Sequence, residues 1–480
     1  MSNFYITTSI PYVNGDPHIG FAMELLQADV LARRARQQGK ATIFSTGSDE
    51  HGTKVAEKAA SLGLTPQAFA DEVSQKFRDL GTLLNTSADR FVRTTDKGHE
   101  QRSQLIWKNL AQDIYKASYI GWYDVRQEEF VSESQIDPER TNPSHPQAYR
   151  KLEEENYFFA LSKYTNAIRE KIESDEFKIV PKTRRNEILA LLKEGLEDIS
   201  ISRPKDKLAW GIPVPGDSTQ VMYVWFEALM NYITVLGYPE HEDFQNFWPA
   251  NVQVIGKDIT RFHAAIWPGM LMSLGLELPK TLYVHSFITV EGQKMSKSIG
   301  NVIAPSDIVA RYGVDPFRYY FLRHIPSYED GDFSWETFEN AYNNELANEL
   351  GNTVQRTAVM ISKYQNGLIG DIPKPTHDVQ AIEQAIDECR FDRALDLIWE
   401  QIRGLNQYIE ETKPWAIAKD GDEDHLREVL AYQVSCILEV AELLLPFMPE
   451  TAEKIVGMFS EGVLRPIDGT LFPKNEEVTE

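Results

Sequence analysis

The sequence predicts an α/β protein: a Rossmann-type, doubly wound parallel sheet that is split by an inserted module and followed by an all-α helical bundle. Short apolar strand patterns alternate with amphipathic helix patterns over residues 1–110 and return between residues 221 and 287, which is typical of parallel sheets. A polar and aromatic stretch at residues 118–202 interrupts the alternation. After residue 335 nearly every segment has helical periodicity, which indicates a helix bundle.

The elements of the sheet follow in order along the chain. A strand at residues 4–8 leads into a loop rich in Pro, Asn and Gly. A long helix is expected at residues 19–38, because Ala22, Leu26 and Val30 recur at the spacing of one helix face. Further strands are expected at residues 41–45, 91–94, 221–225, 252–255 and 282–287, with a helix between the last two.

Composition and charge restrict the possible functions. Of 480 residues, 49 are Lys or Arg and 72 are Asp or Glu, which gives a formal charge of −23. This balance argues against a general DNA or membrane binder, since phosphate groups attract basic surfaces, but it allows an enzyme with local RNA contacts. Cys389 and Cys436 are the only cysteines, so a disulfide framework and a cysteine-rich zinc site are excluded. Because the sequence has neither a membrane-spanning apolar run nor a signal peptide, we expect a soluble cytoplasmic protein.

Two loops have the composition of nucleotide-binding loops. The first, PHIGF at residues 17–21, lies between a strand and a helix, where backbone N–H groups and the helix dipole attract phosphate. His18 adds a donor, Gly20 lets a purine approach the backbone, and Glu24 lies one turn further on. An isolated triplet of this kind is more often a tight turn with a packing glycine.

The second loop, GQKMSKSIGN at residues 292–301, places Lys294 and Lys297 among Gly and Ser. Such a cationic flap can close over a polyphosphate and stabilise the charge that develops in phosphoryl transfer. Alone, the loop is as often a solvated basic turn.

In this order and at this separation, the two loops resemble the HIGH and KMSKS signatures of class I aminoacyl-tRNA synthetases. The chain is similar to bacterial methionyl-tRNA synthetases over nearly its full length. The motifs that carry the resemblance are TTSIPYVNGDPHIG, TGSDEHGTK, FVRTTD, ISRPK, WGIPVP, YVWFEALMNY, VIGKDITRFH, WPGML, KMSKS, LGNTVQRT and ETKPWAIAK. So many motifs in one order are far more specific than a shared fold.

The resemblance implies a methionine–tRNA ligase. It would activate methionine with ATP to methionyl-adenylate, with Mg²⁺ accompanying the nucleotide, and transfer it to the 3'-terminal adenosine of tRNA(Met). Residues 1–117 and 203–288 would be the two halves of the catalytic domain, and residues 118–202 the inserted connective module. Residues 289–335 would be the flap and stem-contact region, and residues 336–480 the anticodon-binding domain.

The resemblance also assigns site residues. An apolar, aromatic cage suits a thioether, with Tyr12 or His263 contacting the sulfur and Asp49 binding the ammonium group. The methionine site would comprise Ile10, Tyr12, Asp49, Trp225, Ala228, Leu229, Tyr232 and His263. The ATP site would comprise His18, Gly20, Glu24, Gly256, Asp258 and Lys297, and the catalytic residues would be His18, Lys294 and Lys297. The anticodon would bind Asn352, Arg356 and Trp415, which offer hydrogen bonds and a stacking plane.

Without the family pattern, several of these residues have an ordinary interpretation. Trp225 and Tyr232 would be core aromatics, and Asp258 would be a helix N-cap. Asn352, Arg356 and Trp415 would each be an ordinary surface or core residue of a helix.

Three features depart from the family pattern. Phe21 replaces the second His of HIGH, which removes one donor to the phosphates. Glu227 stands where the family usually has Asp, so its carboxylate reaches one methylene further. The inserted module lacks the Cys-x-x-Cys knuckle that follows an aromatic pair in zinc-bearing relatives, and its later turn offers only Asn142 and His145. We therefore expect no metal site and no zinc, as in the zinc-free bacterial type.

Two other functions stay open. A paralogue would activate another amino acid or load another acceptor; Glu227 favours it, and the retained Tyr12, Trp225 and His263 oppose it. A catalytically weak RNA-binding or regulatory descendant would account for Phe21, although the KMSKS, GKD and SDEHG motifs are intact. We expect a monomer, because no dimerisation domain follows the bundle. We also expect no DNA partner and no membrane partner.

Overall fold

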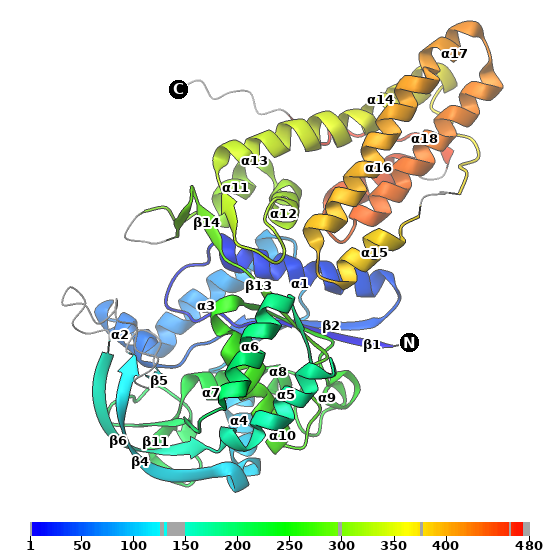
Figure 1. The fold of residues 1–480 in the computed structure, drawn as a ribbon. Helices are drawn as coiled ribbons and strands as arrows, with labels where there is room; N and C mark the ends of the chain where they lie inside the picture. Colours follow the sequence, from blue (N-terminus) through cyan, green and yellow to red (C-terminus); the bar gives the residue numbers. More distant parts are fainter. Residues whose placement is uncertain are drawn as a thin grey trace. The chain divides into compact units, whose positions relative to one another are not determined.

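The computed structural model describes residues 2–124, 129–131, 149–295, 300–374, 378–459 and 462–473. The chain divides into two compact units (Figure 1). The sheet unit comprises Met1–Pro17, Lys40–Leu80 and Ala88–Val284. The helical unit comprises His18–Gly39, Gly81–Ser87 and His285–Glu480.

The sheet unit is built on a six-stranded sheet with the strand order β3-β2-β1-β12-β13-β7. Neighbouring strands in the pairs β1–β2, β2–β3, β1–β12 and β7–β13 are parallel. The strand order reverses beside β1, and ligands bind beyond the carboxyl ends of the strands at such a point. The predicted doubly wound parallel sheet is confirmed. Its strands are β1 (Asn3–Thr8), β2 (Ala41–Ser48), β3 (Arg90–Arg93), β7 (Lys178–Val180), β12 (Val252–Gly256) and β13 (Thr281–His285).

Two strands differ from the sequence prediction. The expectation of a parallel strand at residues 221–225 is wrong, because β11 (Asp217–Met222) lies in a separate antiparallel sheet with β9 (Ser202–Pro204) and β10 (Pro213–Val214). The helix α7 (Val224–Ala228) begins directly after β11. The edge strand β7 comes from the stretch that was expected to be the inserted module. Both segments are short apolar runs, whose periodicity does not identify their partner.

A second antiparallel sheet comes from residues 114–200. Its long strands, β4 (Ile114–Asp124) and β6 (Tyr149–Phe159), pair along their whole length (Figure 1). The short strands β5 (Glu129–Val131) and β8 (Ile199–Ser200) lie at its edges.

The helices of the sheet unit enclose one buried cluster of apolar side chains with the main sheet. In this cluster the Trp107 ring meets the Phe226 ring edge to face at 5.9 Å, and Phe226 lies 5.9 Å from Phe159. Such pairs add to the free energy of burial. The helices are α2 (Thr53–Ser61), α3 (Pro66–Leu83, whose last residues belong to the helical unit), α4 (Lys97–Asn109), α5 (Thr165–Glu173), α6 (Lys182–Glu194), α7, α8 (Asn231–Thr234), α9 (Glu242–Phe247) and α10 (Trp267–Ser273).

The helical unit begins with α1 (Ile19–Gln37), which matches the helix predicted at residues 19–38. A small sheet of β14 (Ile288–Val290), β15 (Gln293–Lys294) and β16 (Gly331–Phe333) carries the basic loop. The expected helical bundle is confirmed (Figure 1). The helices that follow α1 in this unit are α11 (Pro305–Tyr312), α12 (Val314–Arg323), α13 (Trp335–Ala341), α14 (Asn352–Gln365), α15 (Gln380–Asp387), α16 (Phe391–Thr412), α17 (Pro414–Asp420), α18 (Glu423–Leu444) and α19 (Pro449–Phe459).

One buried arginine joins the separate parts of the helical unit. Arg318 on α12 has no exposed side-chain surface and forms an ion pair with the equally buried Asp29 on α1 at 2.7 Å. Its remaining N–H groups donate to the carbonyl oxygens of Leu84, Pro446 and Phe447 at 2.7–3.1 Å. Burial of the charge is therefore compensated by four acceptors, as a buried guanidinium requires.

Asp29 is bound from two other directions as well. Its Oδ2 accepts from Arg33 at 2.8 Å, and its Oδ1 accepts from the backbone N–H and the hydroxyl of Ser87, each at 2.6 Å. Burial alone would raise the pKa of Asp29, but the two guanidinium groups and the hydrogen bonds hold it below its usual value. The carboxylate is thus charged and fixes α1 against α12.

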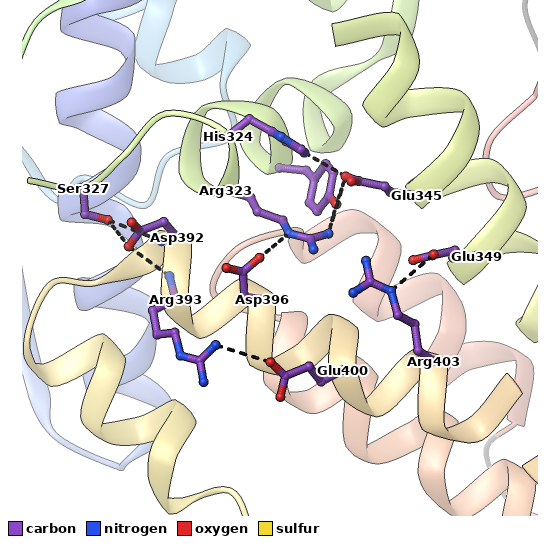
Figure 2. Close-up of polar contacts among 11 residues, drawn as sticks. Arg323, His324, Ser327, Glu345, Glu349, Asp392, Arg393, Asp396, Glu400 and Arg403 are labelled. Atoms are coloured by element: carbon purple, nitrogen blue, oxygen red, sulfur yellow. Dashed lines mark hydrogen bonds and ion pairs between the residues drawn. The ribbon is translucent and has the colours of Figure 1, made fainter. Parts of the chain in front are cut away.

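A continuous helical run over residues 335–365 contains the π-helical segment Tyr342–Gly351 between α13 and α14. Figure 2 shows how charged side chains tie this segment to its neighbours. Glu345 accepts from His324 at 2.7 Å and pairs with Arg323 at 3.4 Å, and Arg323 also pairs with Asp396 of α16 at 3.1 Å. This network joins α12, the π-helical segment and α16, and it thereby fixes the direction of the helical run over residues 335–365.

We predict that Arg318→Met lowers the free energy of unfolding by about 3–5 kcal/mol, because it leaves the charge of Asp29 buried without its main partner. Urea unfolding followed by circular dichroism measures the change. The double variant Asp29→Asn/Arg318→Met should lose less than the sum of the two single variants. Additive losses would show that the two residues do not depend on each other.

Candidate active site

The loops that follow β1 and β2 are hydrogen-bonded to each other. They lie beyond the carboxyl ends of the strands, where ligands are expected to bind. Tyr12 and Asp49 form a parallel β-bridge, in which the Val13 N–H donates to the Asp49 carbonyl at 3.0 Å and the Asp49 N–H donates to the Pro11 carbonyl at 2.9 Å. The Asp49 side chain is buried. Two residues that come from different sequence motifs are thus held next to each other by backbone hydrogen bonds.

Glu50, which follows Asp49 in the SDEHG motif, fixes this loop to residues of other elements. Glu50 has no exposed side-chain surface and accepts two hydrogen bonds from Arg93 at 2.7 and 2.9 Å. Its backbone carbonyl accepts from the indole N–H of Trp210 at 2.7 Å. Two-point recognition of this kind is rigid, so Glu50 acts as a support for Asp49.

Two aromatic contacts connect α7 and α8 with the segment after β12. Trp225 stacks on Phe262 with ring centroids 4.2 Å apart, and the Tyr232 hydroxyl lies 2.6 Å from Nε2 of His263. Tyr232 and His263 are buried, whereas Trp225 is half-buried. His263 lies in a π-helical segment, Phe262–Ile266, and such segments are frequent at functional sites.

The hydrogen bonds of His263 define its protonation state. Nδ1 lies 3.0 Å from the carbonyl oxygen of Ile259, which can only accept, so Nδ1 carries the hydrogen. Nε2 therefore accepts from the Tyr232 hydroxyl. Burial lowers the pKa of His263 to about 4, more than the bond to Ile259 raises it. Both ring nitrogens of this neutral form have partners within the chain, and a contact of His263 with a substrate sulfur stays a prediction.

The other residues predicted around the amino acid and the nucleoside also belong to the sheet unit. Ala228 and Leu229 are buried beside Trp225, and Ile10 is half-buried. Gly256 ends β12 and is itself the N-cap of the short helix Lys257–Ile259, so the N-cap interpretation of Asp258 is wrong. The Asp258 side chain is exposed in the first turn of that helix.

The first predicted nucleotide loop is the start of α1 in the helical unit. His18 is exposed and caps the helix, since its Nδ1 accepts from the Gly20 N–H at 3.1 Å. The hydrogen of the neutral ring is therefore on Nε2. A Cβ at position 20 would lie 3.0 Å from Cε1 of His18, so a larger residue there would press against the ring in this orientation. Phe21 is half-buried and offers no side-chain donor.

Glu24 has a structural partner that the sequence did not reveal. Its carboxylate is buried and lies 2.9 Å from Nε2 of His285, which ends β13. Nδ1 of His285 faces the carbonyl of Ser286 at 2.9 Å. This contact ties α1 to His285, the first residue of the segment of the helical unit that carries the basic loop, and a role of Glu24 toward ATP stays a prediction.

The basic loop reaches the start of α1. Cε of Met295 lies 3.8 Å from the position of a Cβ on Gly20, so the two signature loops meet within the helical unit. Lys294 is exposed, with its ammonium 5.3 Å from the centre of the Phe287 ring, and its carbonyl accepts from Asn301 at 3.3 Å. Lys297 lies outside the described residues.

The three residues predicted to bind the anticodon lie on α14 and α17. The guanidinium of Arg356 lies over the Trp415 ring at 5.8 Å and pairs with Glu410 at 2.8 Å. Trp415 is 39% exposed although it is a large aromatic residue. Asn352 is exposed one turn before Arg356 on the same face of α14. The structure therefore places the guanidinium of Arg356 over the partly exposed ring of Trp415.

The described residues contain no group of three or more His, Cys, Asp or Glu side chains that could hold a metal ion. Asn142 and His145, which sequence analysis named in the inserted module, lie outside the described residues. Within the described part of the chain, no helix is long and apolar enough to cross a membrane.

Two family models match the chain. One, described as tRNA synthetases class I (M), matches residues 4–150 and 144–358, and the other, described as the anticodon-binding domain of tRNA ligase, matches residues 376–477. A methionine–tRNA ligase of Thermotoga maritima is 42% identical over 472 residues, which covers 94% of this chain and 74% of that protein. A methionine–tRNA ligase of Brucella melitensis is 41% identical over 474 residues, which covers 95% of this chain and 92% of that protein.

Solved structures agree with these relatives. The methionyl-tRNA synthetase of Mycobacterium tuberculosis in complex with methionyl-adenylate superposes with a TM-score of 0.93 and is 36% identical, over 99% of this chain and 100% of the other. The apo form of the same enzyme gives a TM-score of 0.86 at 33% identity, over 99% of each chain.

The buried, neutral His263 predicts a measurable pH dependence of stability. In the unfolded chain a histidine binds a proton near pH 6.5, but in the folded protein His263 does so only near pH 4. The unfolded state therefore gains a proton first as the pH falls, and folding stability is lost between these two values. Glutamine does not titrate, so in His263→Gln the free energy of unfolding should fall by about 3 kcal/mol less over this pH range. Urea unfolding of both proteins from pH 7.5 to 4 measures the difference, and parallel curves would contradict the assignment.

Proposed function

The chain belongs to the class I tRNA synthetases of the methionine type, and we infer that it activates methionine with ATP and transfers it to the 3'-terminal adenosine of tRNA(Met). It is an ATP-dependent aminoacyl-tRNA ligase. The observation that supports the assignment of residues is that Cε of Met295 lies 3.8 Å from where a Cβ on Gly20 would be, so the two sequence signatures lie next to each other within the helical unit.

The proposed methionine site belongs to the sheet unit. Asp49 would bind the ammonium group, and its backbone bridge to Tyr12 supports that role because it holds Asp49 next to a second residue of the proposed site. The neutral Tyr232–His263 pair presents no charge to a thioether, which favours sulfur over a charged side chain. The full set is Ile10, Tyr12, Asp49, Trp225, Ala228, Leu229, Tyr232 and His263.

The phosphates are assigned to the helical unit. His18, whose Nδ1 caps α1, would contact a phosphate oxygen, and the first N–H groups of α1 would add further donors. Lys294 and Lys297 would stabilise the charge of the leaving pyrophosphate. Mg²⁺ would accompany the nucleotide. Gly256 and Asp258, at the carboxyl end of β12, are proposed for the adenosine.

The reaction needs no side-chain nucleophile. An oxygen of the methionine carboxylate attacks the α-phosphorus in line, a new acyl–phosphate bond forms, and the bond to the bridging oxygen breaks to release pyrophosphate. A hydroxyl of the terminal adenosine of tRNA then attacks the carbonyl carbon, and AMP leaves. Catalysis comes from positioning and from stabilisation of developing charge.

The segment boundaries and partners complete the proposal. We propose that residues 1–117 and 203–288 form the catalytic domain, residues 118–202 the connective module, residues 289–335 the flap and stem-contact region, and residues 336–480 the anticodon-binding domain. The exposed Trp415 beside Arg356 supports anticodon binding. We further propose a monomer without zinc that works in the cytoplasm and has no DNA or membrane partner.

We predict that ATP–pyrophosphate exchange is stimulated by methionine alone among the twenty amino acids. His18→Ala should lower the exchange rate about 100-fold or more, because it removes a donor to the transition state. Methionine-dependent exchange by the natural chain would also show that Phe21 is tolerated in place of histidine.

The other outcomes distinguish the alternatives. Stimulation by a different amino acid would favour a paralogue with a changed pocket. No exchange with any amino acid, from a protein that is folded by circular dichroism, would contradict the enzyme and favour an RNA-binding descendant.

We predict that Trp415→Ala lowers kcat/KM for charging of tRNA(Met) about 5- to 100-fold, because a base loses its stacking plane. Methionine-dependent ATP–pyrophosphate exchange should stay unchanged, since it needs no tRNA. Leu368→Ala is a matched control, because Leu368 is a 62% exposed apolar residue of the same unit. Equal effects of both substitutions on charging would contradict an anticodon role for Trp415.

A further inference from the structure

Glu227 is a buried carboxylate in the middle of the residues assigned to methionine. It lies on α7 between Trp225 and Ala228 and has no exposed side-chain surface. Its Oε1 lies 2.7 Å from Nδ1 of His51, and its Oε2 lies 2.9 Å from Nε2 of His99 on α4. Each oxygen of the carboxylate thus has its own imidazole partner.

The two histidines make Glu227 a charged acceptor. A carboxylate accepts hydrogen bonds, so Nδ1 of His51 and Nε2 of His99 both donate. Burial alone would raise the pKa of Glu227, but the two histidines hold it below its usual value. The hydroxyl of Ser103 also lies 3.2 Å from Nε2 of His99. Glu227 is therefore a buried anion of the sheet unit that accepts hydrogen bonds from two imidazole N–H groups.

The two histidines link Glu227 to elements that carry residues of the proposed methionine site. His51 lies two residues after Asp49, in the loop that the Tyr12 bridge and the Glu50–Arg93 pair already fix. Nδ1 of His99 lies 2.8 Å from the hydroxyl of Thr234, which is on α8 two residues after Tyr232. One carboxylate thus connects α7, the Asp49 loop and, through His99, α8.

We propose that Glu227 is the positioning residue of the methionine site: through His51 and His99 it sets the distance between the ammonium ligand Asp49 and the aromatic wall of α7 and α8. The inference rests on the proposed methionine–tRNA ligase activity. The glutamate that departs from the family pattern at this position contacts both histidines in this chain.

The substitution Glu227→Gln tests the charge without a change of volume. Glutamine has one acceptor oxygen and an NH₂ group, so at least one of the two histidines faces a donor and must change its tautomer or move. Glu227→Asp tests the reach, because the carboxylate is withdrawn by about 1.5 Å and cannot keep both bonds unless α7 shifts. Both variants should keep the fold and misplace the methionine site.

We expect Glu227→Gln to raise KM for methionine in ATP–pyrophosphate exchange about 10- to 100-fold, with less than a threefold change in KM for ATP. Glu227→Asp should raise KM for methionine by a smaller factor. Both should also lower the preference for methionine over norleucine, which differs from it only at the sulfur position. The thermal midpoint of each variant is recorded, and kinetics are measured well below it.

Glu154→Gln is the matched control, because Glu154 is a buried carboxylate of the same unit that pairs with Lys207 at 2.8 Å and adjoins no assigned site residue. It should lower stability without any change in KM for methionine. Proportional changes in both KM values for Glu227→Gln, or an unchanged KM for methionine, would overturn the positioning role and leave a structural one. Absence of methionine-dependent exchange in the natural chain would instead contradict the proposed function itself.

Discussion

The helical unit depends on the buried ion pair between Arg318 and Asp29. Without it, α1 would have to bury a carboxylate against α12 and the turn before α19 with no cation to compensate the lost hydration. The pair is important for the site because α1 begins with His18. The position of that histidine relative to the flap is therefore fixed by a charge contact three turns further along the same helix, reinforced by Ser87 and Arg33.

The residues of the first signature have structural as well as chemical reasons for their identity. His18 caps α1 through Nδ1, and Gly20 leaves room beside its ring, because a Cβ at position 20 would lie 3.0 Å from Cε1 of His18. Glu24 is bonded to His285 at the end of β13. This contact holds the first turns of α1 at His285, three residues before β14 begins.

The sheet unit uses a different principle, in which buried carboxylates are each held by two or more donors. Glu50 is held by Arg93, Glu227 by His51 and His99, and the neutral His263 by Tyr232 and a backbone carbonyl. Because every one of these groups has its partners, the apolar wall around them can be rigid although it is rich in polar atoms. A rigid wall is what discrimination among amino acids of similar size requires.

The sequence by itself determined the fold class, the bounds of α1 and the positions of both signature loops, and it named the residues that are proposed for the methionine site. These are local patterns: helical spacing in Ala22, Leu26 and Val30, and motifs of contiguous residues such as KMSKS and SDEHG. Only the tertiary structure decided the place of residues 221–225, the tautomer of His263 and the partners of Glu24, Glu227 and Asp29. The physical reason is that the hydrogen-bond partners of a buried group depend on which distant segments of the chain pack together. Periodicity along the sequence does not predict which segments these are.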